Sequence, residues 1–154
     1  MPVLVRTRSL SSRPMARDEV SRRAERMLVA AGRPEAELSI LLCDDGVMAE
    51  LNHQYRHEKG PTDVLAFAMH EGEGPGAGTP LLGDVVVSVD TARRQARDRG
   101  HTIREEITTL LAHGILHLLG YDHRTRAEER RMNALTDGLK AAASARSDRP
   151  RPRG

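Results

Sequence analysis

Cysteine and aromatic residues are nearly absent from this chain. Cys43 is the only cysteine among 154 residues, which excludes an intrachain disulfide and a metal site built from several cysteines. We expect Cys43 to be a small apolar core residue. With two Tyr, one Phe and no Trp, the chain has almost none of the side chains on which single-strand binders of the aromatic-platform type stack bases.

Long apolar runs are also missing. No stretch approaches the roughly 20 apolar residues of a membrane-spanning helix, and the first ten residues, MPVLVRTRSL, hold no apolar run long enough for a signal peptide. We therefore expect a cytoplasmic protein with no membrane partner. The length, with 38% hydrophobic and 30% charged residues, fits one globular domain with its own core.

Neither sign of charge clearly prevails. The 24 Lys plus Arg residues stand against 22 Asp plus Glu, for a formal net charge of +2. The only lysines are Lys59 and Lys140, and arginine suits bidentate contacts with phosphate. A genome-wide preference for arginine codons explains the same bias, so the charge permits a polyanionic partner without demonstrating one.

The apolar patterns predict, in chain order, a strand, a helix, a strand, a helix, two strands and then three helices. Strands are predicted at PVLVRTR (2–8), ELSILLC (37–43), DVLAFAM (63–69) and GDVVVSV (83–89), the last two apolar on both faces as in strands covered from two sides. Helices are predicted within 11–32, ending at Gly32, after an Asp44 or Asp45 cap, within 91–100, from Thr102 onward, and at 125–143.

This order predicts an α+β fold: a single small domain in which a mixed sheet of about four strands packs with about five helices. We assign residues 1–143 to this domain. The Gly/Pro-rich segment 70–81 is expected to be a mobile loop, and the Arg/Pro-rich segment 144–154, SARSDRPRPRG, a disordered tail.

Three of the seven histidines stand in HGILHLLGYDH, residues 113–123. Thr102 and Glu105 form a capping-box pattern at the start of an amphipathic helix, on which His113 and His117 lie about 40° apart. Gly120 suits a left-handed turn that brings His123 back toward them. Three imidazoles so placed are typical of a zinc site whose fourth position stays open, the catalytic kind of zinc site. For any one of these histidines taken alone, the simpler interpretation is a partly buried polar residue that forms a hydrogen bond.

The other histidines and Gly114 narrow this interpretation. His53 and His57 repeat the i, i+4 spacing without a third partner, so we expect them to be surface residues. Zinc proteases of the HExxH type carry a glutamate after the first histidine as general base, and that position is Gly114 here. The sequence therefore disfavours a protease, and we expect Gly114 to serve close packing.

The motif resembles the signature of the YbeY family of bacterial endoribonucleases. ELNHQYRHEKGPTDVLAF and LLGDVVVS are similar to two further blocks of that family, so the resemblance covers about half of the chain. Ala66 and Ala68 stand where the family commonly has Ser and Pro, a departure expected to affect the strand more than the site.

The resemblance implies one zinc ion per chain, bound by His113, His117 and His123, with Arg56 as a functional arginine. The planar guanidinium of Arg56 could bind the oxygens of a phosphodiester with two hydrogen bonds. Asp122 either orients a ligand imidazole or stabilises the turn. The implied activity is a single-strand-specific, metal-dependent endoribonuclease for the 3′ end of small-subunit rRNA and for ribosome quality control.

The expected partners are precursor rRNA and the small ribosomal subunit, with its proteins or an assembly GTPase; no DNA partner is expected. The alternative is a non-catalytic ribosome assembly factor with a structural zinc. The open fourth coordination position favours the nuclease, whereas the missing general base and the scarcity of aromatics favour the assembly factor.

Overall fold

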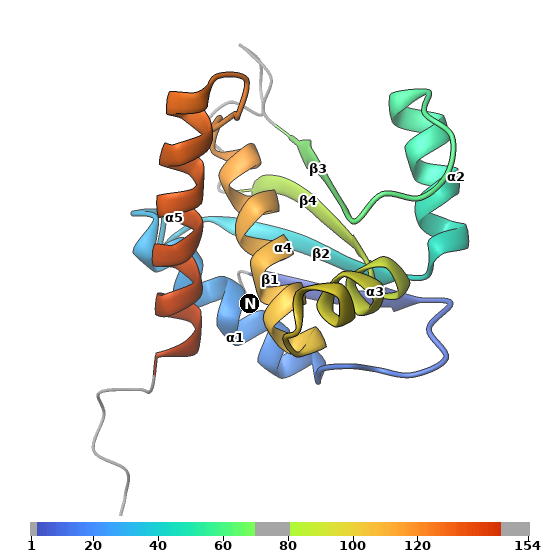
Figure 1. Cartoon of the computed structure of the whole chain (residues 1–154). Coiled ribbons are helices and arrows are strands. Elements are labelled where there is room, and N and C mark those ends of the chain that lie inside the picture. The colour runs from blue at the N-terminus through green and yellow to red at the C-terminus, as the bar shows by residue number, and fades with distance from the viewer. Residues whose placement is uncertain (1–2, 70–80, 146–154) are drawn as a thin grey trace, which may run out of the picture.

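The computed structural model describes residues 3–69 and 81–145. Within these two ranges the chain forms a mixed sheet of four strands and five helices, which confirms the predicted α+β domain (Figure 1). The strands are β1 (Val3–Arg8), β2 (Glu37–Cys43), β3 (Val64–Ala68) and β4 (Leu81–Ser88). The helices are α1 (Arg17–Ala30), α2 (Asp45–Arg56), α3 (Val89–Arg99), α4 (Ile103–Leu118) and α5 (Arg126–Ser144). The predicted loop at 70–81 lies outside the described residues except for Leu81, and 146–154 of the predicted tail lie outside them too.

Helix ends lie where local hydrogen bonding places them. The side chains of Asp44, Thr102 and Thr125 accept hydrogen bonds from the backbone N–H groups of Val47, Glu105 and Glu128, and so begin α2, α4 and α5. Past the end of α1, Gly32 adopts the left-handed conformation, with φ of 78°. The sequence predicted the ends at Thr102 and Gly32, and Asp44 is one of the two residues expected to begin α2.

The sheet has the order β1-β2-β4-β3. β1, β2 and β4 are parallel, and β3 is antiparallel to β4 at one edge. Helices α1, α4 and α5 cover one face of the sheet, where the larger hydrophobic core lies, and α2 covers part of the other (Figure 1). Because β3 is an edge strand, no further strand pairs with its outer side.

The two apolar strands differ in how they are covered. β4 is buried on both faces, as predicted. On β3, Leu65 packs under α2 in the smaller core, but Val64, Ala66 and Ala68 on the opposite face line a cavity. The prediction of full cover was therefore wrong for one face of β3, and this open face is one wall of the site described next.

Candidate metal centre and active site

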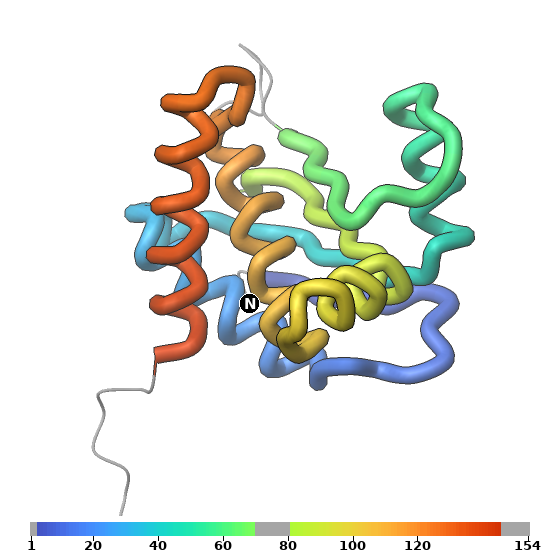
Figure 2. The backbone as a smooth tube through the Cα atoms, viewed as in Figure 1, coloured from blue at the N-terminus to red at the C-terminus, as the bar shows by residue number. Residues whose placement is uncertain are grey.

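A cavity of about 670 Å³ collects residues that are far apart in the sequence. Arg56 from the end of α2, His113 and His117 from α4, and His123 from the turn after α4 all line it. The path of the chain explains this, since α4, its following turn and β3 run close to one another in Figure 2. The four residues singled out by the sequence thus share one cavity.

Helix α4 can lie close to the sheet because of Gly114. A methyl group at that position would come within 2.6 Å of Val85 Cγ1 on β4, closer than such atoms approach one another. This confirms the packing role expected for Gly114, and it shows why a glutamate base could not stand there. The same close approach puts the neighbouring His113 half-buried at the cavity wall, while His117, one turn later, is exposed.

The turn after α4 brings His123 to His117. Gly120 has φ of 96°, and the N–H of Tyr121 donates to the carbonyl of Leu116 at 3.0 Å, so the chain reverses as predicted. The imidazole centres of His117 and His123 lie 5.6 Å apart, edge to face.

These side chains fit a metal ion by their donor chemistry. Two imidazoles bound to one tetrahedral zinc at about 2.0–2.1 Å have ring centres about 5 Å apart, close to the spacing of His117 and His123. Within residues 3–69 and 81–145, no three His, Cys, Asp or Glu side chains are already grouped to hold an ion. A third ligand therefore requires side-chain rotation within the cavity.

His113 and His117 favour the neutral state that binds metals. Burial lowers the pKa of His113 below its ordinary value, although the charge of Asp63 opposes the shift. Burial also lowers the pKa of His117, and the neighbouring His123 adds to this effect. At neutral pH both imidazoles can offer a lone pair without first losing a proton.

Arg56 lines the same cavity from a different helix. It is the last residue of α2, and His57 then ends the helix in the left-handed conformation with φ of 58°. The Arg56 side chain is exposed, lines the cavity, and its charge acts to lower the pKa of His117. A guanidinium so placed can reach a phosphate that enters the cavity.

The remaining histidines lie outside this group. His53 and His57 are exposed, as expected. His101 contacts the fully buried carboxylate of Glu106 at 2.5 Å, and Arg99 also donates to that carboxylate at 2.9 Å. His70 falls outside the described residues.

Asp122 takes the second of its two expected roles in the structure. One carboxylate oxygen accepts the N–H of His123 at 2.7 Å, and the other pairs with Arg124 at 2.8 Å. The hydrogen bond from His123 holds the pKa of Asp122 below its ordinary value. The carboxylate thus stabilises the turn that carries His123.

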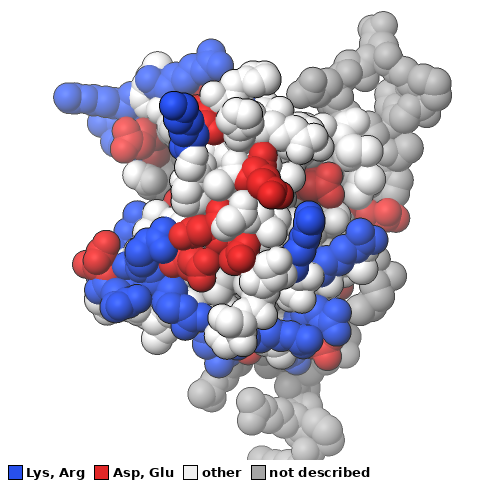
Figure 3. All heavy atoms as spheres, turned by 90° about the vertical axis from the view of Figure 1, so that its right-hand side faces the viewer, with Lys and Arg blue, Asp and Glu red and all other residues white. Residues whose placement is uncertain are grey.

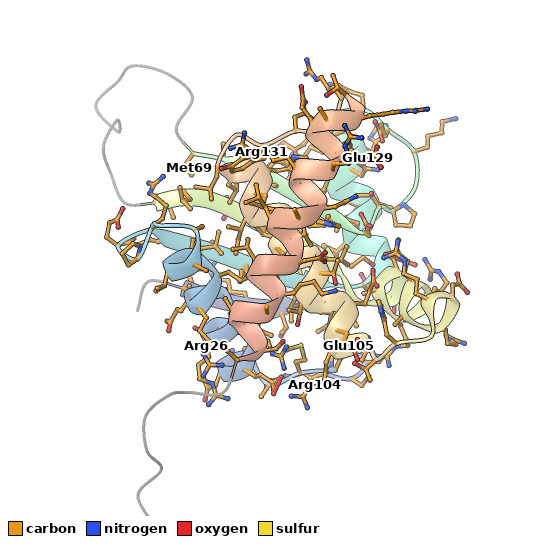
Figure 4. The ribbon with its side chains drawn as sticks, turned by 60° about the vertical axis from the view of Figure 1, so that its left-hand side comes forward. Arg26, Met69, Arg104, Glu105, Glu129 and Arg131 are labelled. Carbon is orange, nitrogen blue, oxygen red and sulfur yellow. The ribbon has the colours of Figure 1, made fainter. Side chains whose placement is uncertain are left out.

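The structure adds residues that the sequence did not single out. Three further residues line the cavity: Asp63, directly before β3, and Glu129 and Asn133 on α5. Figure 4 shows Glu129 near the N-terminal end of α5. Asp63 lies within the PTDVLAF block that carries the resemblance, so a signal was present; Glu129 and Asn133 had none. Two carboxylates therefore line the cavity, although the histidine motif itself carries no general base.

Ala66 and Ala68 require a correction. They were expected to affect the strand more than the site, yet both line the cavity. Because alternate residues of β3 face the same side, the two small side chains widen the cavity wall opposite α4. The departure from the family pattern therefore lies in the site itself.

Comparison with known proteins identifies the family. The family model described as Endoribonuclease YbeY matches residues 8–143. The chain belongs to the YbeY family. It is 48% identical over 120 residues to endoribonuclease YbeY of Aquifex aeolicus, covering 78% of each chain, and 45% identical over 140 residues to that of Pelotomaculum thermopropionicum, covering 86% of this chain and 90% of the relative.

A solved structure shows the same fold. The solution structure of TM1509 from Thermotoga maritima superposes with a TM-score of 0.62 at 23% identity, covering 92% of this chain and 88% of that one. The YbeY fold therefore accounts for nearly all of the described chain. None of the described helices is long and apolar enough to cross a membrane.

Proposed function

We propose that this protein cleaves single-stranded RNA at the cavity, with one zinc ion held by His113, His117 and His123. Its membership of the endoribonuclease YbeY family makes it an endoribonuclease. The observation that supports the site is the convergence of the three histidines and Arg56, from separate elements, on one cavity. We further propose precursor small-subunit rRNA, trimmed at its 3′ end, as the substrate.

The residues divide the chemistry between them. When bound, the zinc ion would polarise a phosphoryl oxygen and lower the pKa of a bound water. Arg56 binds the scissile phosphate through its planar fork and stabilises the negative charge that builds in the transition state. Val64, Ala66 and Ala68 keep one wall free of bulky side chains, so that an RNA strand can enter.

The cavity favours catalysis over a purely structural zinc. Structural zinc sites are closed by four protein ligands. Here His117 and His123 are exposed, and the cavity beside them is large enough for a nucleotide. An assembly factor with a structural zinc is therefore the less favoured account. In the cell, we propose a cytoplasmic protein that associates with ribosomal particles and works there with ribosomal proteins or an assembly GTPase.

Metal analysis of single-histidine variants tests the site. Purified protein should carry close to one equivalent of zinc, and His113→Ala, His117→Ala and His123→Ala should each lose most of it. His53→Ala and His57→Ala, which remove exposed histidines at the same spacing, should keep the parent content. Undiminished zinc in all three site variants would overturn the proposal.

A further inference from the structure

The face of the sheet opposite α1, α4 and α5 is only partly covered. Helix α2 covers it where the smaller core lies, over Cys43, Leu65 and Val86 (Figure 1). Beside α2, a groove of about 520 Å³ remains on the same face, and we call it the sheet groove. Polar and aromatic residues of all four strands and of α2 line it, among them Arg6, Arg8, Ser39, Tyr55, Phe67 and Asp84.

The strand register arranges these side chains across the whole sheet. Ser39 on β2 pairs with Asp84 on β4, and Asp84 pairs with Phe67 on β3. On β1, Leu4 pairs with Ser39, and Arg6 follows two residues later on the same face. The sheet groove therefore runs from the β1 edge of the sheet to the β3 edge.

Two of the three Tyr and Phe residues of the chain meet in this groove. The ring centroids of Tyr55 and Phe67 lie 5.1 Å apart, with the ring planes tilted by 57°. Phe67 is half-buried, but Tyr55 is 57% exposed, so much of its ring is open to solvent. Exposed aromatic rings on a sheet are the surfaces on which single-stranded nucleic acids stack their bases. The few aromatic residues of this chain are thus concentrated where they can act together.

Charged groups beside the rings complement the rest of an RNA strand. Arg6 and Arg8 are exposed and line the groove, and guanidinium groups bind phosphate oxygens in pairs. Asp84, the neighbour of Phe67 across the β3–β4 pair, can accept a hydrogen bond from a base amino group. Rings, arginines and a carboxylate together match the base faces, phosphates and base edges of single-stranded RNA.

The sheet groove and the histidine cavity adjoin one another at two elements. On β3, Ala66 and Ala68 line the cavity, whereas Phe67 between them lines the groove. On α2, Arg56 lines the cavity, whereas Tyr55 directly before it lines the groove. Because β3 is a short strand at the edge of the sheet, an RNA strand that passes Arg56 can continue around this edge to the two rings.

We propose that the sheet groove binds the part of a single-stranded RNA that flanks the cleavage site, with bases stacked on Tyr55 and Phe67 and phosphates bound by Arg6 and Arg8. The inference rests on the proposed cleavage of RNA at the cavity and extends the binding site beyond it. The RNA is then held on both faces of β3, at the reacting phosphate by Arg56 and at the flanking bases by the rings.

The affinity for RNA tests the role of the exposed ring. Tyr55→Leu removes the ring, whereas Tyr55→Phe keeps a ring and is the matched control. Fluorescence anisotropy with a single-stranded RNA of about 16 nucleotides, the upper length that one single-strand-binding domain covers, measures binding. The zinc-loaded protein is titrated first, and then again with a chelator that prevents metal-dependent cleavage. Tyr55→Leu should bind about 5- to 100-fold more weakly than the parent, and Tyr55→Phe should bind like the parent.

The salt dependence of the same affinity tests the arginines. Arg6→Gln should lower the slope of log Kd against log salt concentration by about 0.7, the value for one phosphate contact with a single strand. Arg97→Gln removes an exposed arginine of α3 that lines neither the cavity nor the groove, and it should keep the parent slope. The melting temperatures of Tyr55→Leu and Arg6→Gln should match that of the parent, because both side chains are exposed.

Two results would overturn the inference. One is parent-like RNA affinity in Tyr55→Leu together with a parent-like salt slope in Arg6→Gln. The other is parent-like RNA affinity in Tyr55→Leu with loss of its association with ribosomal particles, which would make the groove a surface for a protein.

The outcomes also separate this inference from the proposed function. If the parent binds no zinc and cleaves no RNA while Tyr55→Leu still loses RNA affinity, the cleavage function is wrong and the sheet groove stands. If the parent cleaves RNA as expected while Tyr55→Leu binds RNA like the parent, only the role of the groove is wrong.

Discussion

Arg56 can be removed from the cavity without touching a metal ligand. It lines the cavity from α2, whereas the histidines come from α4 and the turn after it. Arg56→Ala should leave zinc content and thermal stability nearly unchanged and lower the cleavage rate by about 10² to 10³ fold, the usual effect of losing one preorganised charge-stabilising donor. Single-turnover cleavage at saturating protein checks this, because binding defects drop out.

Two variants sharpen the Arg56 measurement. Arg56→Lys should restore the rate only in part, since a point charge replaces a planar fork. Arg97→Ala, which removes an exposed arginine of α3 outside the cavity, should cleave at the parent rate. A parent-like single-turnover rate in Arg56→Ala would exclude Arg56 from the chemistry and favour the assembly-factor account.

The reactivity of the Cys43 thiol tests whether the core around it is closed to solvent. Burial, reinforced by the charges of Asp44 and Asp45, raises the pKa of the Cys43 thiol to about 12. Because the thiolate is the reactive form, native protein should resist alkylation at pH 8 and react at once in denaturant. The raised pKa also contributes stability that is complete below the thiol's unfolded pKa and is lost as pH rises toward 12. Fast alkylation of native protein would show that this core is open.

At the residue scale, the sequence predicted what is local. The spacing of His113 and His117 on one helix, and the glycine before His123, follow from backbone geometry. Asp63 could not be singled out, because its place in the cavity lining depends on how β3 packs beside α4, which no local pattern encodes. Asp122, for which two roles were open, is settled by hydrogen bonds within its own turn.

The contact between α4 and β4 depends on a missing side chain. Gly114→Ala should destabilise the protein by about 1–3 kcal/mol, because the added methyl group meets Val85 and overpacks the interface. Gly138→Ala, in α5, adds the same methyl group with nothing within 4 Å and should be neutral or slightly stabilising. Chemical denaturation of both variants measures the difference; equal stabilities would mean that α4 does not lie tightly on the sheet.

Among the elements, helix ends were more predictable than sheet neighbours. Three helices begin with a side-chain hydrogen bond to a backbone N–H three residues later, at Asp44, Thr102 and Thr125. Such a cap depends only on neighbouring residues, so the local sequence is enough to predict it. The apolar run of β3 led us to expect that both of its faces are covered. One face is open, because an apolar run does not show that a strand lies at the edge of the sheet. That misjudged face is part of the functional cavity.

Charge over the whole molecule is mixed rather than uniformly basic. Figure 3 shows Lys and Arg side chains surrounding a central group of Asp and Glu on one face, in keeping with a formal net charge of only +2. If arginines contact RNA phosphates, association with ribosomal particles should weaken as salt rises, because bound counterions are released on binding. Sedimentation of the protein with ribosomal particles at increasing salt checks this; association that resists high salt would argue for contacts with protein instead.

The fold class of the whole molecule was predictable because most strands and helices carry their own apolar pattern in the sequence. The strand order and the reversed direction of β3 were not, since pairing is decided by tertiary packing. The wall of the cavity that β3 forms depends on this strand order. The histidines could therefore be predicted from the sequence, whereas the β3 wall could not.

One measurement tests the central claim most directly: cleavage of precursor small-subunit RNA, free and within ribosomal particles, by zinc-loaded protein and by His117→Ala prepared in parallel. We predict that the parent cleaves single-stranded RNA, that removing the metal with a chelator abolishes cleavage and adding zinc restores it, and that His117→Ala is inactive under all these conditions. Cleavage by His117→Ala at the parent rate, or by metal-stripped parent at an undiminished rate, would contradict the account.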